Sequence, residues 1–185
     1  MRIIDLHESD AARILAVAEI MTVSFRGISS SYQTLEDALE SVSESFEDHE
    51  LSRIAIDSDG NVVGWIAGIS QYDGNVWELD PLVVRRDSQL KGIGRALVAD
   101  FENCVGEKGG RTIWLGTDDE NGRTSLSQGD LFPGVLDKAK ELKNLNNHPF
   151  AFYQKLGFEV VGVLPDANGP GKPDIFMAKP VRSLP

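Results

Sequence analysis

A glycine-containing segment in the middle of the chain has the residue types and spacing needed to hold an anionic group. It follows an apolar run that ends at Val84, and it leads into apolar residues spaced four apart: Ile93, Leu97, Phe101 and Val105. That period predicts a helix over 92–107. The first N–H groups of a helix are unpaired and lie at the positive end of its dipole, so they attract anions. Gly92 and Gly94 lack side chains and leave the backbone open to a pyrophosphate.

The spacing of these glycines narrows the kind of anion site. Arg86, Lys91 and Arg95 add positive charge around the loop. The order is neither Gly-x-Gly-x-x-Gly nor the P-loop pattern, because Lys91 precedes the glycines, so a Rossmann or ATP site is disfavoured. A glycine-bearing turn before a helix, with no ligand, is the alternative interpretation of the same residues.

Composition limits the classes of partner. The 185 residues carry 29 acidic and 18 basic side chains, a net charge of −11, which argues against nucleic acid and anionic membrane surfaces. This charge favours a cationic small molecule, although solubility alone also explains an acidic chain. One cysteine excludes an internal disulfide, and three scattered histidines predict no metal site. No membrane-spanning run or signal peptide is found, so we expect a cytoplasmic protein.

The pattern of apolar residues predicts a single domain over 1–185. The expected strands are 2–6, 52–56, 62–69, 76–84, 112–117, 158–164 and 174–179. The expected helices are 10–24, one opened by Thr34, 92–107, 130–145 and 149–156. Thr34 and Asp37 form an approximate capping box, and Pro81 predicts a bulge or splayed pairing within strand 76–84. Strands and helices in this order indicate a mixed α/β or α+β fold.

The loop before helix 92–107 resembles a known cofactor motif. Gln89-x-x-Gly92-x-Gly94 is similar to the acyl-CoA signature of the GNAT acetyltransferases, and the expected order of elements agrees with that family. The resemblance implies a mostly antiparallel central sheet of six to seven strands flanked by helices. It also implies that acetyl-CoA is the co-substrate and that the loop amides hold its pyrophosphate.

Longer matches point to one subgroup, the aminoglycoside 6'-N-acetyltransferases. The matching segments are Trp77–Val84, Leu115–Asp119, Thr124–Ser127, His148–Tyr153, Val163–Gly169 and Lys172–Ile175. They agree at matching separations, which makes them more specific than the CoA motif. The resemblance implies acetylation of a primary amine on a cationic substrate. Proteins of this kind are often homodimers, so we expect a homodimer here.

The resemblance also assigns catalytic roles. Glu78 is the expected base for the amine, and Tyr153 is the expected acid for the departing thiolate. A side chain that points to solvent is the alternative for Glu78, and a half-buried core position is the alternative for Tyr153. Leu82 corresponds to the residue whose N–H donates to the acetyl carbonyl. Asp80 departs from the subgroup, which has histidine there, and an ionised carboxylate would instead act as a base or bind a second ammonium.

The same resemblance supplies the binding residues. The cofactor-binding set is Leu82, Val83, Val84, Gln89, Leu90, Lys91, Gly92, Ile93, Gly94, Arg95 and Tyr153. The substrate-binding set is Trp77, Glu78, Asp80, Asp118 and Asp119. For the acidic pair Asp118 and Asp119 a solvated loop is an equal alternative, and a core position is an alternative for Trp77.

Two other functions remain open at this point. A GNAT enzyme acting on a polyamine, small metabolite or peptide amine is favoured by the departure at Asp80. A non-catalytic acyl-CoA-binding domain on the same fold is the third alternative, against which Glu78 and Tyr153 both argue.

Overall fold

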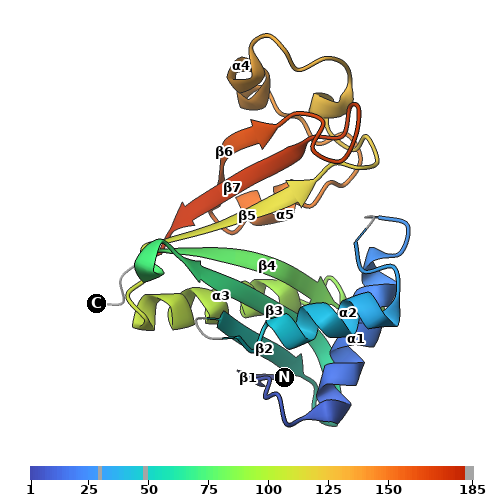
Figure 1. Cartoon of the computed structure of the whole chain (residues 1–185), viewed down its shortest axis with the longest axis vertical. Helices are drawn as coiled ribbons and strands as arrows, with labels where there is room; N and C mark the ends of the chain where they lie inside the picture. Colours follow the sequence, from blue (N-terminus) through green and yellow to red (C-terminus); the bar gives the residue numbers. More distant parts are fainter. Residues whose placement is uncertain (29–30, 48–49, 182–185) are drawn as a thin grey trace. The chain divides into compact units, whose positions relative to one another are not determined.

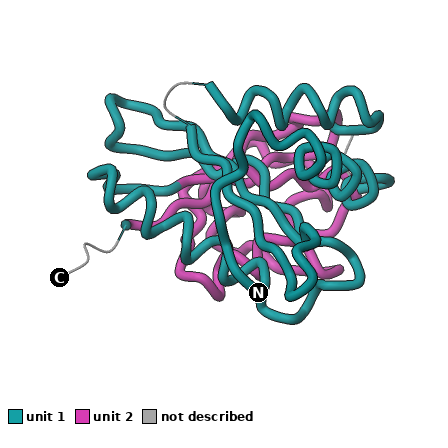
Figure 2. Tube along the Cα trace, turned by 90° about the horizontal axis from the view of Figure 1, so that it is seen from below, with its two compact units in different colours: residues 1–113, 181–185 teal, residues 114–180 magenta. Residues whose placement is uncertain are grey.

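The computed structural model describes residues 1–28, 31–47 and 50–181. Contacts between Cα atoms divide the chain into two compact units (Figure 2). The first unit is Met1–Ile113 together with Val181–Pro185, and the second is Trp114–Pro180. The single domain over 1–185 stays a prediction.

Four antiparallel strands form the framework of the first unit (Figure 1). They are β1 (Arg2–Asp5), β2 (Glu50–Ile56), β3 (Val62–Gln71) and β4 (Val76–Val84), each hydrogen-bonded to the next. The β2–β3 turn is closed by Asp57, whose carboxylate accepts the backbone N–H groups of Asp59 and Asn61. A short 3₁₀ turn, η1 (Tyr72–Gly74), connects β3 to β4.

The β3–β4 pairing carries the irregularity expected at Pro81. Ile66 pairs with Leu82, whereas Gly68 pairs with Leu79, so one residue of β3 faces two of β4. Proline cannot donate to the ladder, and the extra residue relieves that defect. The bulge falls at Asp80 and Pro81, so it lies next to the expected catalytic residues of β4.

Helices cover both faces of these strands. Trp65 and Ala67 share a core cluster with α1 (Ala11–Phe25) and α2 (Leu35–Glu44). On the alternate positions, Gly64 and Gly68 lie against Leu97 and Phe101 of α3 (Ile93–Glu107). Because neighbouring strand residues point to opposite faces, α3 lies on the face opposite α1 and α2.

The helix ends follow local signals. The capping box at α2 is present, since Thr34 Oγ1 accepts Asp37 N–H at 3.1 Å and the Asp37 carboxylate accepts Thr34 N–H at 3.0 Å. α3 ends at Glu107, and Gly109 adopts a φ of +82° just beyond it. The expected start of α2 and end of α3 are therefore confirmed.

The second unit contains a three-stranded layer and two short helices. Its strands are β5 (Thr112–Asp118), β6 (Glu159–Leu164) and β7 (Asp174–Pro180), in the order β5-β7-β6, with β6 and β7 antiparallel. Its helices are α4 (Val135–Lys140) and α5 (Phe150–Gln154), and the 3₁₀ turn η3 covers Ser125–Ser127. The seven strands found among the described residues, with their flanking helices, confirm the expected mixed, mostly antiparallel fold class.

Two expected helices of this unit are shorter in the structure. The helix expected over 130–145 is only Val135–Lys140, because Gly134 with a φ of +88° begins it after Pro133. It ends where residues 143–145 turn to pair with the segment after β5: Leu145 N–H donates to Arg123 O at 2.9 Å. The helix expected over 149–156 is Phe150–Gln154.

Within the described part of the chain, every helix is too short or too polar to cross a membrane.

Candidate functional site

The expected anion-binding loop lies between β4 and α3. The 3₁₀ turn η2 (Arg86–Ser88) follows β4, and α3 begins after Gly92, which has a φ of +84°. Leu90 also has a positive φ, +61°, and its side chain points into solvent. Because Gly92 has no side chain, it adopts this left-handed conformation without strain.

The backbone amides of this loop are available to a ligand. The first hydrogen bond of α3 runs from Ala96 N–H to Gly92 O at 3.0 Å. Over the described residues, the amides of 90–95 have no intramolecular acceptor. A Cβ placed on Gly92 would meet no atom within 4 Å, so the approach to these amides is open. The loop therefore fits a diphosphate, whose oxygens accept such N–H groups.

Side chains of the loop hold its shape. Gln89 Nε2 donates to Val84 O at 3.1 Å, and Lys91 Nζ donates to Asp87 O at 2.9 Å. Arg95 is exposed on the first turn of α3, whereas Ile93 is buried. The strand residues Leu82, Val83 and Val84 pair with Ile66, Trp65 and Gly64, and Val83 is buried in the core.

Strand β4 separates the expected catalytic residues from the expected aromatic contact. Glu78 and Asp80 point to one face, while Trp77 and Leu79 are buried on the other. Trp77 is 3% exposed, and its ring meets Phe101 of α3 edge-on at 6.4 Å between centroids. The structure therefore does not support Trp77 as a substrate contact; alternation along the strand makes it a core residue.

Glu78 has the environment of a base. It is half-buried, and Oε2 accepts a hydrogen bond from Gln71 Nε2 at 2.7 Å. Burial raises the pKa of Glu78, and the bond from Gln71 only partly opposes that rise. A carboxylate with a raised pKa takes a proton more readily than an exposed one.

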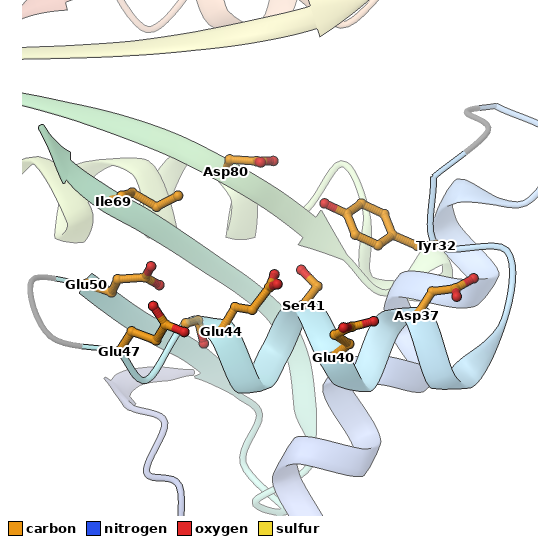
Figure 3. A pocket seen from close by; sticks show the side chains of 10 residues that line it. Tyr32, Asp37, Glu40, Ser41, Glu44, Glu47, Glu50, Ile69 and Asp80 are labelled. Atoms are coloured by element: carbon orange, nitrogen blue, oxygen red, sulfur yellow. The ribbon is translucent and has the colours of Figure 1, made fainter.

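Asp80 lies at an acidic pocket of the first unit with a volume of about 410 Å³ (Figure 3). Carboxylates enter from α2, from β2 and from the residues between them, and Asp80 enters from β4. The lining residues are Tyr32, Asp37, Glu40, Ser41, Glu44, Ser45, Glu47, Glu50, Ile69 and Asp80. With six carboxylates and no lysine or arginine among these lining residues, the pocket attracts cations.

The pocket perturbs its own titratable groups. Burial raises the pKa of Glu50 to about 7, and the nearby carboxylates of Glu47 and Glu44 add to the rise. Burial likewise raises the pKa of Tyr32, with a contribution from the charge of Asp80. Repulsion of this kind is relieved when a cation enters, since it stabilises the ionised forms.

The sequence motifs did not predict the α2 residues that line this pocket. The signal was present as acidic residues at helical spacing, Asp37, Glu40 and Glu44, on the side of α2 away from its apolar stripe. Such a face is usually solvated, and only the pairing of β3 with β4 brings Asp80 and Ile69 to it.

The expected acid, Tyr153, lies on α5 of the second unit. Its ring packs edge-on against Phe152 at 5.1 Å and Phe158 at 5.6 Å between centroids. It is half-buried, so aromatic neighbours fix its ring on the short helix.

The two aspartates at the end of β5 differ sharply. Asp118 is exposed, and its Oδ1 accepts a hydrogen bond from Asn168. Asp119 is 0% exposed: its oxygens accept the N–H groups of Arg123 (2.7 Å) and Thr124 (2.8 Å) and the hydroxyl of Ser127.

Asp119 therefore holds its own loop together. Burial alone would raise the pKa of Asp119, but the hydrogen bonds from Ser127, Arg123 and Thr124 outweigh it and keep that pKa below its usual range. Direct substrate binding by Asp119 is not supported, because its carboxylate is enclosed and already bonded at both oxygens.

The described residues contain no cluster of three or more His, Cys, Asp or Glu with the geometry of a metal site.

The sequence matches the family model of the GNAT acetyltransferases over residues 14–124, more than half of the chain. The chain belongs to the GNAT acetyltransferase family. Its loop before α3 therefore occurs in an enzyme family that transfers acetyl groups. A comparison with curated proteins found no match.

Solved structures give finer comparisons for this GNAT acetyltransferase. It is similar to an aminoglycoside 6'-N-acetyltransferase complexed with coenzyme A, at 37% identity, covering 100% of this chain and 99% of that one, with a TM-score of 0.90. The enzyme of the same name from Enterococcus faecium is 38% identical over 100% and 99% of the two chains, with a TM-score of 0.89. An aminoglycoside 6'-acetyltransferase type Ii is 31% identical over 100% of both chains, with a TM-score of 0.76.

Proposed function

We propose that this GNAT acetyltransferase moves the acetyl group of acetyl-CoA to the 6'-amine of an aminoglycoside or a closely similar polycation. Three solved aminoglycoside 6'-acetyltransferases match it along its full length. The single observation that carries the proposal is the acidic pocket at Asp80, on the face of β4 that also bears Glu78. A polyamine substrate carries positive charge complementary to that pocket.

In the proposed mechanism, the substrate amine, Glu78 and Tyr153 each give or take a proton. The substrate amine binds as an ammonium and gives one proton to Glu78, acting through water, so that its lone pair is free. The nitrogen attacks the thioester carbon, and the carbonyl oxygen, while negative, accepts the N–H of Leu82. The carbon–sulfur bond then breaks, the thiolate takes the Tyr153 proton, and the second amine proton returns through solvent to the phenolate. The products are the amide and free CoA, with one proton released.

Other residues bind and position acetyl-CoA and the substrate. We assign the diphosphate of acetyl-CoA to the amides of 90–95, supported by their lack of intramolecular acceptors. Lys91 and Arg95 place positive charge at the same loop. The carboxylates of the α2 pocket hold the other ammonium groups of the substrate by charge-assisted hydrogen bonds.

A matched pair of substrates tests the acceptor position. Neomycin and paromomycin differ only in a 6'-amine against a 6'-hydroxyl. We expect CoA release with neomycin and none with paromomycin, measured by a thiol reagent and by mass spectrometry of the drug. Equal turnover of both would rule out the 6'-amine as acceptor, and turnover of neither would reject the aminoglycoside as substrate.

Replacing the base tests the mechanism. Glu78→Gln removes the proton acceptor but keeps the size of the side chain, so kcat should fall by about a hundredfold or more. The dissociation constant for CoA, measured by calorimetry, should not change. Glu159→Gln, an exposed glutamate on β6, is the control and should leave both values alone. Unchanged turnover in Glu78→Gln would show that another group is the base.

A second candidate function rests on Asp80. A carboxylate where the resembled subgroup has histidine, opening into a pocket of carboxylates, also suits a linear polyamine such as spermidine. Turnover of spermidine with a higher kcat/KM than neomycin would favour it. The homodimer, the cytoplasmic location and the single domain stay predictions.

A further inference from the structure

His148 is a buried polar residue with no part in the proposed chemistry. It lies in the second unit, 2% exposed, just before α5. Its Nε2 bonds to the backbone carbonyl of Asp118 at 3.0 Å, at the end of β5. Its Nδ1 accepts the backbone N–H of Phe150 at 3.2 Å, at the start of α5. One imidazole thus connects the end of a strand to the beginning of a helix.

These two bonds require one form of the ring. A carbonyl oxygen only accepts, so Nε2 must carry the proton, while Nδ1 must be bare to accept an N–H. The neutral Nε2–H tautomer satisfies both bonds. Protonation would place a second N–H on Nδ1, facing the N–H of Phe150, and would break the bond at the start of α5.

The backbone around His148 is fixed from a second direction. The Asn144 side chain donates to His148 O at 2.9 Å and accepts His148 N–H at 2.9 Å. Arg123 donates to Asn146 O at 2.9 Å. Hydrogen bonds therefore hold the loop that leads into α5, and the imidazole is the part of it that bonds to β5.

Tyr153 lies one turn beyond this junction. Its N–H donates to Pro149 O at 3.3 Å, so its position along α5 follows from residues 148 and 149. With only five residues, α5 has little internal stability, and its orientation depends on how its first turn is held.

We propose that neutral His148 is a positioning residue that holds α5, and with it the Tyr153 hydroxyl, in the orientation needed to protonate the CoA thiolate. This inference rests on the proposed function, in which Tyr153 is the acid. His148 itself contacts neither substrate nor cofactor; it acts through the helix.

The charges around the ring set its pH range. Burial lowers the pKa of His148, while the hydrogen bond to Asp118 O and the charge of Asp119 partly raise it and Arg123 lowers it. The ring is therefore neutral at pH 7. As pH falls through this lowered pKa, below the usual value of 6.5, the junction loses its bond to Phe150 and kcat should fall with it.

Two variants separate the two bonds. His148→Gln can still donate to Asp118 O, and His148→Asn can still accept from Phe150 N–H, because their amides reach the positions of Nε2 and Nδ1. Each should lower kcat by about ten- to a hundredfold, the size expected for a misplaced group, and leave KM for acetyl-CoA unchanged. In both variants the acid limb in the pH profile of kcat should lose the contribution of His148 and keep only that of the base Glu78. Wild-type kcat in both variants would overturn the proposal.

A double-mutant cycle with Tyr153→Phe separates positioning from general support of the fold. If His148 acts through Tyr153, adding His148→Gln to Tyr153→Phe should change kcat by less than about twofold. If the two losses multiply instead, His148 supports the fold generally and the proposal fails. If Tyr153→Phe alone keeps full activity, the acid role and this inference both fail, while the acetyl transfer itself would stand.

One measurement is independent of activity and of any variant's folding. The ¹⁵N shifts of the His148 ring in the wild-type protein should show a bare Nδ1 and a protonated Nε2 at pH 7, and the ring should titrate below pH 6.5. The opposite tautomer, or a ring charged at pH 7, would overturn the proposal.

Discussion

Carboxyl groups in the first unit have been given two different environments. Glu78 is held by Gln71, and burial raises its pKa, which suits a base. Glu50 has neighbouring carboxylates at Glu44 and Glu47, and its pKa reaches about 7. The bond from Gln71 orients the Glu78 carboxylate. The carboxylates around Glu50 instead repel one another, and a bound cation or a proton reduces that repulsion.

Glu50 makes substrate binding depend on pH. As pH rises through about 7, Glu50 ionises and the pocket gains a charge, so KM for a polycation should fall more in the wild type than in Glu50→Gln. Comparing the two proteins at each pH cancels the titration of the substrate's own amines. Steady-state kinetics from about pH 6 to 8 measure it, and identical pH profiles would contradict the assignment of the cation to this pocket.

The same group affects folding, with the opposite sign. Because the folded pKa of Glu50 lies above its ordinary 4.5, the folded state binds the proton more tightly than the unfolded chain. Its contribution to stability is therefore present below about pH 4.5 and is lost as pH rises through 7. Glu50→Gln should raise Tm relative to the wild type at pH 8 by more than at pH 5, measured by calorimetry.

At the scale of elements, α3 packs closely on β3 at Gly68, beside the bulge in β4. Gly68 pairs with Leu79, next to Glu78, and a Cβ there would lie 2.3 Å from the Phe101 ring and 2.5 Å from Glu78 O. Backbone atoms cannot yield as a flexible side chain would. The absence of a side chain at Gly68 thus allows α3 and β4 to lie close to this position of β3.

Gly68→Ala should be destabilising. The added methyl must displace Phe101 or the backbone of β4, a type of overpacking that costs about 1–3 kcal/mol. Urea unfolding measures the loss, and kcat should fall as well, since Glu78 moves. Gly162→Ala on β6 is the control: its Cβ would lie 3.4 Å from the Phe176 ring, close to ordinary contact. Equal stability of the two variants would contradict this account.

At the scale of the whole molecule, negative charge is concentrated in one pocket and positive charge in the loop before α3. The net charge is −11, and one pocket contains six of the carboxylates. The loop before α3 carries Arg86, Lys91 and Arg95 in an otherwise acidic chain. An acidic surface draws cations toward it, while a local basic loop allows an anionic co-substrate to bind.

Salt should therefore weaken turnover of a polycation. Raising NaCl from about 20 mM to 500 mM screens the pocket, and kcat/KM for neomycin should fall by about tenfold or more. A monoamine acceptor should lose less, because it carries fewer charges. A kcat/KM that is independent of salt would show that long-range attraction contributes little.

The sequence by itself determined features that depend on neighbours along the chain. The four-residue period of α3 and the capping box at Thr34 and Asp37 were readable because a helix and its caps involve residues at most four apart. The same holds for the loop at Gly92 and Gly94, whose amides are free simply because a helix begins there. The resemblance to GNAT enzymes rested on the Gln89-x-x-Gly92-x-Gly94 motif, the expected order of elements and the longer matching segments.

Only the tertiary structure decided the features that depend on distant partners. The pocket at Asp80 exists because β3 and β4 pair so that Ile69 and Asp80 face α2. Trp77 became a core residue through its contact with Phe101, and Asp119 became a loop anchor through Ser127. Burial and hydrogen bonding across the fold set the roles of these side chains, and neither is encoded in residue type or local spacing.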